Sequence, residues 1–333
     1  MRRREFIVGF GTLVVVSARL VSAQQSDRPV IGILSFGTPT SYDLEAYREG
    51  LKEAGYVEGQ NLAIEYRFAN DDPFRLSELA SDLVRSRVRV IVAVASGLAV
   101  RAAKDATNAI PIVFGYGADP VKQGLVASLN RPGGNITGVI SLAEALYGKQ
   151  LGIMHELLPH AIHFGVLANP NSTLRELIVK DTQTAASALG LTVEILDAGS
   201  DDDIDALFKR LGEEKQVQAM LITNDPFFIG RRERLAALAA RYALPSIYPF
   251  REMAEAGGLL SYGPSLASRD RQAALYVARI LKGESPADLP VVQVNKFELV
   301  INQKVAKALG LSFPNSMQLL VDEGGAERLL CSF

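Results

Sequence analysis

The stretch QAMLITNDPFF, residues 218–228, joins a short apolar run to Asn-Asp-Pro and then to two phenylalanines. Two other apolar runs, PIVFGYGADP (111–120) and HFGVLANP (163–170), also end in Asp or Asn followed by proline. An Asp or Asn side chain can cap a helix, and proline fits the first helical turn because its missing N–H would have no partner there. The pattern predicts buried strands that lead directly into helices.

Apolar runs alternate with amphipathic helical patterns along most of the chain. PVIGILSF (29–36) is typical of a buried parallel strand, and YDLEAYREGLKEAGY (42–56) has the periodicity of an amphipathic helix. Four strand and helix units precede an Arg-Pro-Gly-Gly turn at 131–134, and the alternation then restarts. Such repeats imply parallel sheets with helices on both faces. We therefore predict an α/β fold of two doubly wound lobes with a central cleft.

The two predicted lobes exchange segments, because no low-complexity linker separates the halves of the alternation. We expect the chain to cross between them near Gly138, Tyr262 and Val291. The first lobe then comprises residues 28–138 plus 264–288, and the second comprises residues 141–261 plus 291–325.

The N-terminal segment has the features of an export signal. A basic head precedes an apolar run at 6–18, and a small-residue Val-Ser-Ala site follows at 21–23. The run is shorter than the roughly 20 residues that a membrane-spanning helix needs. We expect removal of residues 1–23 and a periplasmic protein. The paired arginines resemble a twin-arginine motif, but the general secretory route stays open.

Charge argues against a nucleic-acid-binding protein, and the cysteine content excludes a disulfide-stabilised fold. The signal contains four Arg and one Glu, so its removal changes the formal net charge from −2 to −5. A mildly acidic chain has no electrostatic reason to bind nucleic acid. The single cysteine, Cys331, excludes an intrachain disulfide.

Polar and aromatic residues gather at the ends of the predicted strands. Doubly wound sheets bind ligands at the carboxyl ends of their strands, where helix N-termini present free N–H groups. Each of these residues alone could instead be a helix cap or a core side chain. The predicted ligand-binding residues are Phe36, Thr38, Ser96, Gly97, Tyr116, Asp119, Asn169, Asn224, Asp225, Tyr248 and Tyr262.

The sequence carries no recognisable catalytic motif. All three histidines lie in HELLPHAIH (155–163), but their spacing is not that of a zinc helix and Pro159 breaks the helix between them. No Gly-x-Gly-x-x-Gly follows the first strand, and there is neither a Walker-type loop nor a Gly-x-Ser-x-Gly elbow. We expect no metal, no cofactor and no enzymatic activity.

Long motifs then occur in a fixed order through the chain. They include GLKEAGYVEGQNLAIEYRFA (50–69), DPVKQGLVASLNRPGGNITGV (119–139), DPFFIGRRERLAALAARYALPSIYPFREMAEAGGLLSYGPS (225–265) and KFELVINQKVAKALGL (296–311). In these motifs the chain resembles ABC-transporter substrate-binding proteins of the tryptophan/tyrosine-uptake type. The resemblance implies the fold of type I periplasmic binding proteins, in which three crossovers join two lobes and the ligand lies between them. It also implies an aromatic amino acid as the ligand class.

We therefore expect a monomeric periplasmic receptor that binds a small amino-acid-like or aromatic solute and delivers it to an ABC permease with its ATPase. For a zwitterionic ligand, Ser96 and the N–H groups after it would hold the carboxylate, and Asp119 or Asp225 the ammonium. Two alternatives stay open. The protein could serve a membrane sensor kinase, or it could be an exported enzyme on the same fold.

Overall fold

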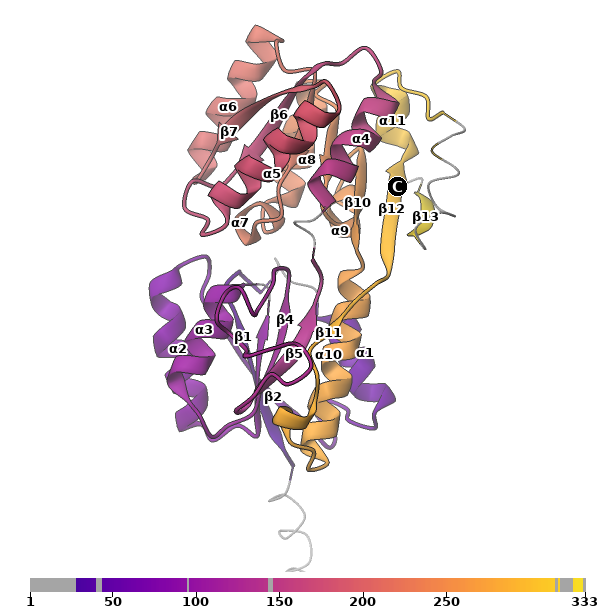
Figure 1. Ribbon diagram of the computed structural model, residues 1–333. Helices are drawn as coiled ribbons and strands as arrows, with labels where there is room; N and C mark the ends of the chain where they lie inside the picture. Colours follow the sequence, from indigo (N-terminus) through magenta and orange to yellow (C-terminus); the bar gives the residue numbers. More distant parts are fainter. Residues whose placement is uncertain are drawn as a thin grey trace, which may run out of the picture.

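The computed structural model describes residues 28–39, 44–94, 96–142, 146–314, 317 and 326–331. The predicted signal, residues 1–23, lies outside these residues. Two sheets, each covered by helices, form two lobes one above the other (Figure 1). The predicted α/β fold of two doubly wound lobes is confirmed. Within the described ranges, every helix is too short or too polar to cross a bilayer.

The first sheet consists entirely of parallel pairs. Its central strand β3 is a run of five apolar residues, all buried, as expected for a strand covered on both faces. In spatial order the strands are β11 (Val292–Gln293), β5 (Ile136–Ile140), β4 (Ile112–Tyr116), β3 (Val90–Val94), β1 (Val30–Ser35) and β2 (Ala63–Phe68).

Helices cover both faces of the first sheet. α2 (Leu76–Arg85) and α3 (Gly97–Ala106) bury apolar residues against one face. α1 (Glu45–Glu53) and α10 (Leu266–Leu281) do so against the other. The 3₁₀ turns η1 (Pro73–Arg75) and η3 (Pro286–Asp288) complete the lobe.

Helix α10 belongs spatially to the first lobe although it follows the second lobe in sequence. It runs beside α1 in the lower lobe (Figure 1). Gly50 allows this approach, because a Cβ atom there would lie 2.7 Å from the Arg271 carbonyl oxygen. A larger side chain on α1 would push the two helices apart.

The second sheet is parallel except for the antiparallel pair β10–β12. In spatial order its strands are β13 (Ala326–Cys331), β12 (Phe297–Asn302), β10 (Leu260–Pro264), β9 (Ser246–Tyr248), β8 (Ala219–Ile222), β6 (His163–Ala168) and β7 (Thr192–Asp197). Its helices are α4 (Tyr147–Leu157), α5 (Arg175–Ala188), α6 (Asp201–Glu214), α7 (Pro226–Ile229), α8 (Arg232–Arg241), α9 (Arg251–Glu255) and α11 (Gln303–Ala308).

The chain passes between the sheets three times: after β5, after β10 and between β11 and β12. β11 pairs with β5 in the first sheet, although the sequence prediction assigns residues 291–325 to the second lobe. The strand is only two residues long, and its neighbour Val294 donates a backbone hydrogen bond to Ile140. Such a short edge strand has no periodicity from which to assign its sheet.

Candidate ligand-binding site

A cavity of about 530 Å³ lies between the lobes. Its walls come from segments that follow β1, β2, β3 and β4 in the first lobe and β6, β7, β8 and β9 in the second. The carboxyl ends of both parallel sheets therefore face the same space, which is where open α/β sheets bind ligands.

The beginning of α3 forms one wall. Ser96 has an extended backbone, and its hydroxyl oxygen accepts a hydrogen bond from the Leu98 N–H at 3.1 Å. Gly97 leaves room for Tyr116, because a Cβ atom there would lie 2.7 Å from the Tyr116 hydroxyl oxygen. Arg101, one turn further along the helix, also lines the cavity. This wall combines a helix N-terminus with a guanidinium group and is suited to a negatively charged ligand group.

Asp225 lies on the opposite wall and combines two roles. Its Oδ1 accepts hydrogen bonds from the Phe227 N–H at 2.9 Å and from the Asn169 side-chain amide at 3.0 Å. The first bond caps α7, and the second ties the end of β8 to the end of β6. Burial raises the pKa of the Asp225 carboxyl above its ordinary value, and the nearby Asp71 carboxylate adds to the increase.

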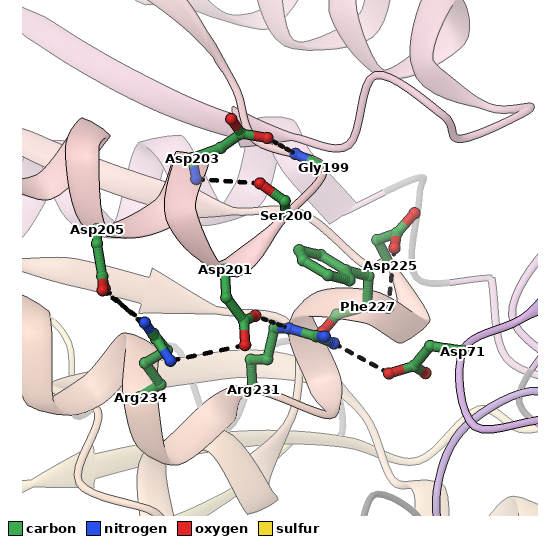
Figure 2. Close-up of polar contacts among 10 residues, drawn as sticks. All are labelled: Asp71, Gly199, Ser200, Asp201, Asp203, Asp205, Asp225, Phe227, Arg231 and Arg234. Atoms are coloured by element: carbon green, nitrogen blue, oxygen red, sulfur yellow. Dashed lines mark hydrogen bonds and ion pairs between the residues drawn. The ribbon is translucent and has the colours of Figure 1, made fainter.

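The two lobes approach closely beside the cavity. A Cβ atom at Gly117 of the first lobe would lie 2.9 Å from the side-chain nitrogen of Asn224 in the second. The Asp71 carboxylate of the first lobe pairs with the Arg231 guanidinium of the second at 3.1 Å. Figure 2 shows Arg231 between Asp71 and Asp201, with Phe227 beside it. The structure therefore has the lobes in direct polar contact.

The sequence matches the family model for ABC transporter substrate binding proteins over residues 37–323. The chain belongs to this family. A Streptococcus pneumonia ABC domain in complex with L-Trp has a TM-score of 0.78 at 26% identity, covering 91% of this chain and 100% of that one. A conserved domain protein from Vibrio cholerae has a TM-score of 0.77 at 27% identity, covering 87% and 97%. A tyrosine-binding protein from Clostridioides difficile is 25% identical over 80% of this chain and 76% of its own.

These comparisons confirm the family resemblance inferred from the motifs. Seven of the predicted binding residues of this substrate-binding protein line the cavity between the lobes. They are Phe36, Ser96, Gly97, Tyr116, Asn169, Asn224 and Asp225.

The other four predicted residues do not line this cavity. Thr38 lies in the loop after β1 and is partly buried. Asp119 instead caps the turn after β4, where its carboxylate accepts hydrogen bonds from the backbone N–H groups of Val121 and Lys122. The two tyrosines, Tyr248 and Tyr262, are buried in the core of the second lobe.

The two tyrosines have the wrong orientation for a cleft. Tyr248 is fully buried, and a Cβ atom at Gly258 would lie 2.5 Å from its ring. Tyr262 lies in the middle of β10 and stacks on Phe297 with ring centroids 6.3 Å apart. Residues along a strand point alternately to its two faces, so nearness to a strand end does not by itself turn a side chain towards the ligand.

Several lining residues were not predicted from the sequence: Asp71, Phe74, Arg101, Gln123 and Arg269. One signal was present for the first two. Asp71 and Phe74 flank Asp72-Pro73, which follows β2 in the same Asp-Pro pattern that marks the other strand ends.

Proposed function

We propose that this protein is the periplasmic solute-binding component of an ABC importer. It binds an aromatic amino acid between its lobes and delivers it to a permease with its ATPase. The observation that carries the proposal is the cavity of about 530 Å³ with walls from both lobes. Its volume falls within the range of about 300 to 1,000 Å³ that is usual for small-molecule sites.

The cavity offers matching surfaces for the parts of an aromatic amino acid. Phe36, Tyr116 and Phe227 provide apolar and aromatic surface for a ring. Ser96, with the N–H groups that begin α3, would hold the carboxylate. Asp71 and Asp225 place negative charge on another part of the wall, where an ammonium group would be favoured.

The relatives support this ligand class. One similar structure was solved with L-Trp, and one curated relative is a tyrosine-binding protein. The matching family is one of substrate binding proteins, and one structural neighbour was solved with bound L-Trp. We propose on these grounds that the protein acts as a receptor, not as an enzyme, and we keep the expectation from the sequence that it is monomeric.

Ligand binding is tested by thermal unfolding of residues 24–333 with and without L-tyrosine and L-tryptophan. A ligand at 100 times its Kd should add about 2.7 kcal/mol to the free energy of unfolding and raise the Tm. D-tyrosine tests whether the site requires the L configuration, and L-leucine tests whether it requires an aromatic ring. An unchanged Tm with all aromatic amino acids would refute the ligand class. Delivery is tested separately, because deletion of the gene should reduce cellular uptake of the ligand identified in this way.

A further inference from the structure

Asp71 is held in a fixed orientation at the edge of the cavity. Asn70 and Asp71 both have positive φ values, 55° and 63°, in the left-handed region that few side chains adopt. Their backbone N–H groups donate to the carbonyl oxygens of Gly37 and Phe36 at 3.2 and 2.9 Å. The loop after β2 is thus tied to the loop after β1, and Asp71 is presented towards the second lobe.

The two carboxylate oxygens of Asp71 have different environments. Oδ2 lies 3.1 Å from Nη1 of Arg231, across the gap between the lobes. Oδ1 is buried and has no hydrogen-bond partner, although the residue lines the ligand cavity. A buried carboxylate oxygen without a donor is energetically unfavourable. A donor from a bound molecule would remove this penalty once a small rotation of the side chain turns Oδ1 to the cavity that the residue lines.

Arg231 is anchored within the second lobe. Its Nε pairs with Asp201 at the beginning of α6, and its Nη1 also donates to the Phe227 carbonyl oxygen at 3.2 Å. The guanidinium carbon lies 3.7 Å from the centroid of the Phe227 ring, close enough for a cation–π contact. Figure 2 shows this arrangement, with Asp71 reaching Arg231 from the first lobe. The Asp71–Arg231 ion pair therefore joins two side chains that are each held in position by contacts within their own lobe.

A second carboxylate increases the negative potential of this wall. Asp71 contributes to the raised pKa of Asp225, so the two groups repel each other when both are ionised. Oδ1 of Asp225 is already occupied by the Phe227 N–H and by Asn169. A cation placed near both groups would relieve the repulsion, and Oδ1 of Asp71 is the atom that lacks a donor.

We propose that Asp71 recognises a protonated amine of the ligand through Oδ1 and couples this recognition to lobe closure through Oδ2 and Arg231. The proposal rests on the proposed function and assigns the ligand's ammonium to Asp71, where the sequence predicts Asp119 or Asp225. The Asp71 side chain then both binds the charged amine of the ligand and bridges the two lobes. Ligands that lack a charged amine cannot form this interaction and bind with lower affinity.

Ligand analogues test the proposal on the unaltered protein. Isothermal titration calorimetry compares L-tyrosine with N-acetyl-L-tyrosine, which has a neutral amide, and with 3-(4-hydroxyphenyl)propanoate, which has no nitrogen. We expect each analogue to bind at least about tenfold more weakly than L-tyrosine. The same comparison is made with L-tryptophan and its N-acetyl derivative. Equal affinity for an amino acid and its deaminated analogue would overturn the proposal.

A matched pair of variants tests the residue itself. Asp71→Asn should weaken L-tyrosine or L-tryptophan binding at least about tenfold, and should weaken binding of the deaminated analogue by the smaller factor, about threefold, that loss of the pair with Arg231 alone produces. The control is Asp72→Asn, because Asp72 caps η1, an asparagine keeps that cap, and the residue does not line the cavity. We expect the control to bind as the wild type does.

The outcomes separate the two proposals. If the wild type binds an aromatic amino acid and Asp71→Asn binds it equally well, Asp71 has no such role but the proposed function stands. If the wild type binds neither amino acid, both proposals fail. Should Asp71→Asn not fold, as judged by its melting curve, Asp71→Ser is compared with the wild type in the same way, because the analogue series alone does not distinguish Asp71 from Asp225.

Discussion

Asp225 shows how one residue can stabilise a helix and carry an unfavourable charge. Its carboxylate caps α7, but burial raises its pKa, so ionisation is disfavoured in the folded protein. We expect Asp225→Ala to lower the free energy of unfolding by about 0.5 to 2 kcal/mol, because the cap is lost. Asp225→Asn keeps a capping oxygen and removes the charge, so it should be at least as stable as the wild type at neutral pH.

The pH dependence provides a second measurement for the same residue. A carboxyl whose pKa is raised by folding binds its proton more tightly in the folded state, so its contribution to stability falls as pH rises above the unfolded pKa. Urea unfolding between pH 4 and 8 should show this fall for the wild type and a smaller one for Asp225→Asn. Asp119→Asn is the control, since Asp119 caps an exposed turn. A wild-type midpoint for Asp225→Ala would contradict the capping role.

At the scale of elements, the strand ends were predictable because their chemistry is local. Ser96, Asn169 and Asp225 follow apolar runs directly, and each begins a turn or helix by accepting backbone N–H groups. The fold class followed from the same alternation of strands and helices. These features depend on neighbouring residues in the chain, so the sequence carries enough information to place them.

Contacts between distant elements could not be predicted in this way. Asp71 and Arg231 are 160 residues apart, and Arg231 lies in a charged stretch, Arg-Arg-Glu-Arg, in which nothing distinguishes the arginine that crosses the cleft. Tyr248 of β9 and Tyr262 of β10 were predicted to line the cleft but lie in the core, for a related reason. Their orientation depends on which face of a three-residue or five-residue strand meets the helices.

Helix α9 carries a carboxyl with an unusual environment between the lobes. Glu252 lines a second cavity of about 320 Å³ together with Asp270 of α10 and Ala46 of α1. Its Oε2 is buried without a hydrogen-bond partner. Burial raises the pKa of Glu252 from 4.5 to about 7, and the negative charges of Asp270, Glu298 and Glu255 add to the shift.

This environment predicts a loss of stability as pH rises. Below pH 4.5 Glu252 is protonated in both states, and between 4.5 and about 7 the unfolded chain loses its proton first, so the free energy of unfolding falls. The full loss is on the order of 3 kcal/mol. Glu252→Gln should abolish it, so the variant gains stability over the wild type at pH 8 but not at pH 4. Urea titrations at several pH values measure the difference.

The control for Glu252 is Glu233→Gln. Glu233 lines the same cavity but its side chain is 76% exposed, so its removal should leave the pH profile unchanged. Parallel pH profiles for the wild type and Glu252→Gln would show that the carboxyl is solvated in the folded protein.

For the whole molecule, three crossings between rigid sheets allow the lobes to open and close as units. A ligand can shift that equilibrium only through contacts that it makes in the closed state alone. The cavity walls come from both lobes, and Gly117 lies so close to Asn224 across the gap that a Cβ atom there would be 2.9 Å from the Asn224 side-chain nitrogen. We therefore expect the balance between open and closed forms to depend on the few polar contacts that bridge the lobes.

The Asp71–Arg231 ion pair is a polar bridge between the lobes that a single substitution removes. Its side chains are 20% and 22% exposed, so solvent screens the pair less than a surface salt bridge. Opening the lobes would separate the two charges. Arg231→Met should therefore increase the radius of gyration of the ligand-free protein in small-angle X-ray scattering. It should also accelerate ligand dissociation at least about threefold, because truncating a closed-state charge pair acts mainly on the off-rate.

Arg234→Met is the matched control for this change. Arg234 lies in the first turn of α8, directly after Arg231, and pairs with Asp205 at 2.5 Å and with Asp201 at 3.6 Å, both within the second lobe (Figure 2). Its replacement removes a neighbouring arginine that also pairs with Asp201, without breaking a contact between lobes, so size and dissociation rate should stay at their wild-type values. If the two variants instead change the scattering equally, the effect comes from loosening of α8, and the ion pair across the cleft does not control closure.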